Sequence, residues 1–81
     1  MDSKILLENI NKIKTTELGI DRIKNNLGLD DCDVVEYCKK KILDENANIY
    51  KKGKNWYVEV ENQRITINSN TYTIITAHQI K

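Results

Sequence analysis

The spacing of apolar residues changes once along this chain, close to residue 46. Before that point apolar residues recur at helical intervals, as Leu6, Ile10 and Ile13 do. After it they alternate with polar residues, as Trp56 and Val58 do. Helices followed by a run of strands predict an α+β fold. A chain of 81 residues has no room for a second core, so we expect a single domain over residues 1–81.

Three helices are expected in the first part, at about residues 3–14, 16–27 and 33–44. Thr15 and Thr16 interrupt the first helical pattern, and either threonine can cap the second helix. Gly28 is well placed to end that helix in a left-handed conformation. Asp33 and Glu36 have the spacing of a capping box, which indicates the start of the third helix.

Four strands are expected in the second part, at about residues 47–51, 56–61, 64–68 and 72–80. The turns between them fall at Gly53, at residues 62–63 and at residues 68–70. Such short links make neighbouring strands antiparallel, because a parallel return needs a long crossover. The sequence therefore predicts a four-stranded antiparallel meander with the three helices packed on one of its faces.

Strand parity divides the first three strands into two sets of side chains. The apolar set is expected to face the helices: Ile49, Trp56, Val58, Val60, Ile65 and Ile67. The other set is expected on the open face: Tyr50, Lys52, Tyr57, Glu59, Glu61, Arg64 and Thr66. A turn at residues 62–63 pairs Glu61 with Arg64 and Glu59 with Thr66.

The fourth strand has two alternative registers, which differ in the face that carries His78. A three-residue loop pairs Arg64 with Thr76, places Tyr72, Thr76 and His78 on the open face, and sends Ile75 and Ala77 into the core. It also leaves Ile74 on the open face. A two-residue loop reverses every one of these positions. We favour the first register, because burying four polar side-chain ends would require four hydrogen-bonding partners.

Five side chains are candidates for catalysis on the open face: His78, Arg64, Thr76, Glu59 and Glu61. An imidazole or a carboxylate can move a proton, and a guanidinium can stabilise charge on a phosphate. The layout of helices followed by a meander resembles that of barnase-like and RelE-like ribonucleases. That resemblance implies a toxin-like, RNA-cleaving domain that uses His78 and Arg64.

Seven side chains are candidates for binding rather than catalysis: Tyr50, Tyr57, Tyr72, Lys51, Lys52, Lys54 and Arg64. Tyrosines can stack on bases or anchor a protein partner. Cross-strand pairs of charged and hydroxyl side chains are ordinary on a half-polar sheet and require no activity. We therefore favour a non-enzymatic binding module that presents its open sheet face to a protein or RNA partner. Self-association into a homodimer through that face is a further alternative.

A third interpretation uses the helices on either side of Gly28 as a helix-turn-helix, with the hairpin at residues 51–54 as a wing. Asp33 and Glu36 count against it, because acidic residues at the start of a recognition helix repel phosphates.

Charge and cysteine content exclude several classes of protein. The net charge of +1 gives no general attraction to nucleic acid or to a membrane, and no apolar stretch is long enough to span one. Cys32 and Cys38 have a spacing unsuited to a disulfide or a shared metal. We expect reduced cysteines in a cytoplasmic protein, with no metal site and no cofactor.

Three phrases of the sequence are similar to a family of short bacterial proteins that carry a domain of unknown function. They are TELGIDRI at residues 16–23, GKNWYV at residues 53–58 and RITINSNTYTIIT at residues 64–76. The resemblance implies a single bacterial domain and brings no catalytic residue with it.

Overall fold

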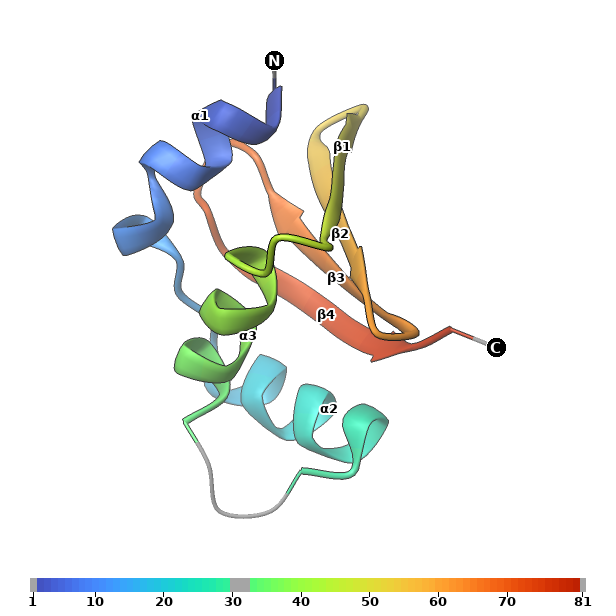
Figure 1. The fold of residues 1–81 in the computed structure, drawn as a ribbon. Coiled ribbons are helices and arrows are strands. Elements are labelled where there is room, and N and C mark those ends of the chain that lie inside the picture. Colours follow the sequence, from blue (N-terminus) through green and yellow to red (C-terminus); the bar gives the residue numbers. More distant parts are fainter. Residues whose placement is uncertain (1, 30–32, 81) are drawn as a thin grey trace.

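The computed structural model describes residues 2–29 and 33–80, so Cys32 lies outside the described residues. The helices are α1 (Asp2–Glu8), the 3-10 turn η1 (Ile10–Lys12), α2 (Glu17–Leu27) and α3 (Val34–Ile42). The strands are β1 (Asn48–Lys52), β2 (Asn55–Val60), β3 (Gln63–Asn68) and β4 (Ile74–Gln79). They form one antiparallel sheet in the order β1-β2-β3-β4, and Figure 1 shows this sheet alongside the helices. The predicted α+β class and meander are confirmed.

The caps expected for the second and third helices are present. The hydroxyl of Thr16 accepts a hydrogen bond from the backbone N–H of Gly19 at 3.0 Å. Gly28 ends α2 with a φ of 66°, a left-handed conformation that glycine adopts without a Cβ penalty. The carboxylate of Asp33 accepts from the backbone N–H groups of Val35 and Glu36, at 3.1 and 3.2 Å.

The first helix is shorter than the predicted residues 3–14. It ends at Glu8. The side-chain amide of the next residue, Asn9, donates a hydrogen bond back to the carbonyl of Ile5 at 2.8 Å. After the 3-10 turn the backbone is extended, and Lys14 forms a parallel bridge with Thr73. A helical Lys14 could not make these contacts with the sheet, so tertiary pairing overrides the helical pattern here.

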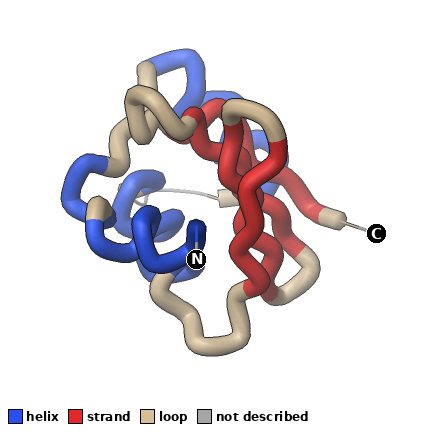
Figure 2. Tube along the Cα trace, turned by 90° about the horizontal axis from the view of Figure 1, so that it is seen from above, coloured by secondary structure: helices blue, strands red, loops and turns tan. Residues whose placement is uncertain are grey.

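One apolar cluster joins all three helices to the sheet. α1 contributes Leu6, α2 contributes Ile23 and Leu27, and α3 contributes Val34, Cys38 and Ile42. The sheet contributes Trp56, Val58, Ile65, Ile67, Ile74 and Ala77, which define the buried face. Burial of one Leu or Ile side chain stabilises a fold by roughly 1.5–3 kcal/mol relative to exposure, so this cluster dominates the packing. Figure 2 shows the strands as one twisted layer beside the helices.

The turn between β2 and β3 lies one residue earlier than predicted. Glu61 and Asn62 form it, with φ angles of 51° and 62°, and two positive φ angles are the mark of a type I′ hairpin turn. Gln63 consequently belongs to the ladder, and the hydroxyl of Tyr37 on α3 donates to its side-chain oxygen at 2.9 Å. Arg64 therefore pairs with Glu59, not with Glu61.

The register of β4 also differs from the prediction. Arg64 pairs with His78 and Thr66 with Thr76, in place of the predicted Arg64–Thr76 pair. This shift of two residues keeps Thr76 and His78 on the predicted face and Ala77 in the core.

Because of a bulge in β4, two isoleucines exchange the positions predicted for them. The register changes beside Thr66 and Ile67, so that Ile67 pairs with Ile74 and Ile75 is the additional residue. Ile74 is buried and Ile75 is 38% exposed, the reverse of the prediction. The bulge lets Ile74 and Ala77 both face the core although three positions separate them.

Tyr72 is not on the open face as predicted. It precedes β4, has a φ of 56°, and its ring centroid lies 5.3 Å from that of Trp56. Its ring packs against the apolar cluster.

Candidate functional site

The face of the sheet opposite the buried face carries two rows of side chains, which we call the polar face. The first row, read across the strands, is Tyr50, Tyr57, Thr66 and Thr76, and the second is Asn48, Glu59, Arg64 and His78. Directly paired residues in an antiparallel sheet have Cβ atoms about 4.5–5.5 Å apart, so neighbours within a row lie in contact range. Strand pairing therefore brings together residues that the chain spaces over 31 positions, from Asn48 to His78.

Three side chains of the polar face form a connected polar group. The hydroxyl of Tyr50 donates to Oε2 of Glu59 at 2.6 Å, and Nε of Arg64 donates to the same oxygen at 2.9 Å. The hydrogen bond from Tyr50, and after it the one from Arg64, lowers the pKa of the Glu59 carboxyl from its ordinary value. The same bond raises the pKa of the Tyr50 hydroxyl, because ionisation would place two anions together.

This group holds Arg64 in place and makes Glu59 a poor general base near neutral pH. A carboxylate with a lowered pKa has little tendency to accept a proton there. The Arg64 side chain remains 37% exposed.

A hollow of about 390 Å³ adjoins this group on the polar face. Tyr50, Lys52, Gly53, Tyr57 and Arg64 line it. The rings of Tyr50 and Tyr57 stack with centroids 5.4 Å apart and planes at 21°. Gly53 supplies the hairpin turn at one end, with a φ of 64°. Two aromatic rings and two cations thus surround one small concavity, a combination suited to a planar, anionic ligand.

His78 stands directly across the ladder from Arg64. Its Nδ1 is buried and has no hydrogen-bond partner among residues 2–29 and 33–80. The next side chain in β4 on this face, Thr76, lies within 3.4 Å of the amide nitrogen of Asn26 on α2.

The remaining sequence-predicted residues lie away from the hollow. Glu61 accepts a hydrogen bond from Lys41 of α3 at 2.7 Å, and that bond raises the pKa of the lysine. Lys51 lies on the other side of β1, with Nζ 5.9 Å from the ring centroid of Trp56. Lys54 is in the turn after Gly53, where its carbonyl accepts from the backbone N–H of Ser69. Of the predicted binding residues, Tyr50, Lys52, Tyr57 and Arg64 are brought together.

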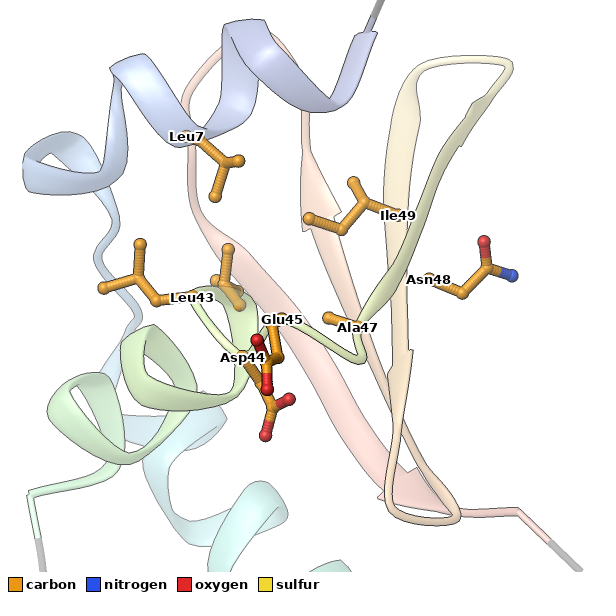
Figure 3. Close-up of a pocket in the computed structure, with 8 residues that line it drawn as sticks. Leu7, Leu43, Asp44, Glu45, Ala47, Asn48 and Ile49 are labelled. Atoms are coloured by element: carbon orange, nitrogen blue, oxygen red, sulfur yellow. The ribbon is translucent and has the colours of Figure 1, made fainter.

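Sequence reasoning missed a second concavity, of about 440 Å³, between α1, the end of α3 and β1. Its apolar lining includes Leu7, Ile42, Leu43, Ala47 and Ile49, and Asp44 and Glu45 lie beside it. Figure 3 shows Leu7 of α1 and Ile49 of β1 projecting toward the same space. Leu7 falls outside the buried stripe of α1 and Leu43 directly follows α3, and these two apolar residues are the signal in the sequence that could have indicated this surface. We call it the edge pocket.

The described part of the chain holds no group of three or more His, Cys, Asp or Glu side chains that could bind a metal ion. Nor is any helix within it both long enough and apolar enough to cross a bilayer.

The chain belongs to the family described as "Protein of unknown function (DUF3781)", whose model matches residues 7–78. The resemblance to a family with a domain of unknown function is thereby confirmed. No curated protein and no solved structure matches this chain.

Proposed function

We propose that this protein is a non-enzymatic binding module of the cytoplasm, and that its polar face binds single-stranded RNA. The proposal includes the inference that the helices pack chiefly on the buried face, that Asn26 of α2 reaches the polar face at Thr76, and that the hollow beside Tyr50 and Tyr57 stays accessible. It is carried by one observation, the stacked Tyr50–Tyr57 pair beside Lys52 and Arg64 around a single hollow.

The chemistry of that hollow supports an RNA ligand. A base can stack on a tyrosine ring whatever its identity, and such contacts are worth about 1–3 kcal/mol per base. Lys52 and Arg64 supply cations for the phosphates that flank a stacked base. Because Glu59 offsets part of the charge of Arg64, we expect moderate affinity that depends on stacking as much as on charge.

The hydrogen bonds of the polar group also reduce the entropic cost of binding. Tyr50 and Arg64 are both fixed on Glu59 before any ligand arrives. A ligand that meets side chains already held in place avoids much of the cost of immobilising them.

The direct test is fluorescence anisotropy with a labelled single-stranded oligouridine. Tyr57→Ala should weaken binding by roughly tenfold, the loss of one stacking contact. Lys52→Ala should weaken binding and flatten its salt dependence, whereas Lys40→Ala, which removes an exposed lysine of α3, should leave both unchanged.

Two results would contradict RNA binding. One is a wild-type protein that does not bind the oligonucleotide at low salt. The other is equal weakening by Lys52→Ala and Lys40→Ala, which would indicate general charge attraction. Binding of an acidic peptide that is sensitive to Tyr57→Ala, without RNA binding, would assign the polar face to a protein partner.

A second candidate function is RNA cleavage, favoured by the direct pairing of His78 with Arg64 across the sheet. In such a reaction the imidazole would move a proton and the guanidinium would stabilise charge on the phosphate. Incubation of pure protein with RNA tests it: cleavage that is abolished by His78→Ala supports an enzyme, and intact RNA removes this candidate.

The helix-turn-helix interpretation stays a prediction. The carboxylate of Asp33 is engaged as the cap at the N-terminus of α3, where a recognition helix would approach DNA. That placement counts against it.

A further inference from the structure

Strand β1 forms an edge of the sheet, and its backbone pairing shows which groups point outward. Lys52 and Asn55 close a two-residue hairpin, so this pair is hydrogen bonded and the pairs alternate from there. Tyr50 and Asn48 consequently bond to β2, while the N–H and C=O groups of Ile49 and Lys51 point away from the sheet. Within residues 2–29 and 33–80 no backbone or side-chain group bonds to these outward groups.

Apolar surface lies beside this edge. The edge pocket adjoins β1 at Ile49, and two of its lining residues are unusually exposed for leucines, Leu7 at 37% and Leu43 at 58%. An unpaired strand edge next to exposed apolar side chains is a template for an additional strand.

The two ends of this segment carry opposite charges. Asp44 and Glu45 precede β1, and Lys51 and Lys52 end it. Glu45 and Lys51 form no ion pair with another described residue. A second copy of β1 in the antiparallel direction would place the lysines of each copy beside the acidic residues of the other. In the parallel direction lysines would face lysines.

We propose that two copies of this chain associate through their β1 strands, antiparallel and centred near Ile49. In this register the outward groups of Ile49 pair with those of Ile49 in the second copy, the N–H of Lys51 faces the carbonyl of Ala47 in that copy, and one sheet continues across the dimer. Both copies keep their buried faces on the same side, so Ile49 of one copy closes the edge pocket of the other. Lys51 of each copy lies opposite Ala47 of its partner, and its long side chain reaches toward the partner's Glu45 two residues further along.

A second copy fits this edge better than an unrelated strand for two reasons. The two-fold relation brings Lys51 of each copy near the oppositely charged Glu45 of the other. In addition, Lys51 and Lys52 on an exposed edge discourage pairing with strands that lack acidic residues at the matching end. This inference does not depend on the proposed RNA binding, because the polar face and the edge of β1 are different surfaces.

Sedimentation velocity over a series of protein concentrations tests the proposal through a charge exchange. Wild type should form a dimer as concentration rises. Glu45→Lys and Lys51→Glu should each weaken the dimer by roughly tenfold, because each creates two like-charge contacts across the two-fold axis. The double variant should recover most of the wild-type affinity. Lys40→Glu, an exposed charge reversal on α3, is the matched control and should leave the dimer unchanged.

Circular dichroism of each variant shows whether its fold is kept, so that a loss of dimer is not a loss of structure. A wild-type protein that stays monomeric at every concentration overturns the proposal, and leaves the edge to an extended segment of another protein. A dimer that both single reversals leave intact, or that the double variant does not recover, also overturns it.

Discussion

The two edges of the sheet are treated differently by the rest of the chain. Along β4, backbone groups of Lys14 bond to Tyr72 and Ile74, at 3.1 and 2.7 Å. The hydroxyl of Thr15 adds a bond to the carbonyl of Ile74 at 3.1 Å, and the amide of Asn26 donates to the carbonyl of Ala77 at 3.1 Å. Along β1, the outward backbone groups have no such partners within the described ranges.

The difference shows how the N-terminal segment is used. Its loop and α2 cover β4, and α2 lies against that strand along its length. β1 forms its backbone hydrogen bonds with β2 alone, is further held by the side-chain bond from Tyr50 to Glu59, and contacts α1 with no backbone hydrogen bond between the described residues of the two elements. The fold therefore covers one edge by its own backbone, and the outward backbone groups of the other edge stay unpaired within the described residues.

The largest expected effect on stability comes from a substitution at Gly19, where α2 packs beside β4. A Cβ at this position would collide with the hydroxyl oxygen of Thr15, which is the group that bonds to Ile74. Gly19→Ala should lower the free energy of unfolding by about 1–3 kcal/mol, even though alanine favours the helix. Urea denaturation measures it.

The control is the double variant Gly19→Ala with Thr15→Ala, in which the hydroxyl oxygen of Thr15 that would collide with the new Cβ is absent. Gly19→Ala should cost less in that background than in wild type. Equal or greater stability of Gly19→Ala in the wild-type background would show that the contact with Thr15 is unimportant.

A smaller effect is expected at Asn26, whose amide bonds to the edge carbonyl of Ala77. Asn26→Ala should be less stable than Asn25→Ala by about 1 kcal/mol, the net value of one hydrogen bond. Both residues are exposed asparagines on α2, so helix propensity cancels in the comparison. Two variants of equal stability in thermal or urea unfolding would mean that α2 does not hold β4 through this bond.

The smallest effect concerns the bond that holds β1 to β2, and it depends on pH. Glu59 has a pKa below its ordinary 4.5 in the folded protein, so its contribution is present above that value and is lost as pH falls through the lowered pKa. Tyr50 has a pKa above its ordinary 10.0, so its contribution is present below that value and is lost as pH rises through the raised pKa.

Tyr50→Phe should therefore be less stable than wild type at neutral pH, and the difference should shrink in acid and in strong base. Unfolding curves of the two proteins across the pH range provide the measurement. A difference that does not change with pH would assign the effect of the hydroxyl to packing and not to its bond with Glu59.

The sequence predicted the faces of the sheet better than its pairing. A register error of two residues leaves every side chain on the same face, so Arg64, Thr76 and His78 were placed together although their partners were wrong. The turn was misplaced because Glu61 is an unusual residue at a positive φ, and local turn signals favour Asn62 followed by Gln63.

The remaining errors come from contacts between distant parts of the chain. Two adjacent isoleucines, Ile74 and Ile75, do not show in the sequence which of them enters the core, because a bulge decides it. Likewise, Lys14 continues a helical pattern, and only its pairing with the start of β4 reveals its extended backbone. The edge pocket depends on three elements at once and was missed for the same reason.

The contrast between the edges is tested most directly by amide hydrogen exchange of Ile49 and Lys51, followed by NMR at low and at high protein concentration. If β1 pairs with a second copy, both amides become more protected as concentration rises, while the amide of Tyr57, inside the ladder, stays protected throughout. Rapid exchange of Ile49 and Lys51 that is the same at every concentration would contradict the account.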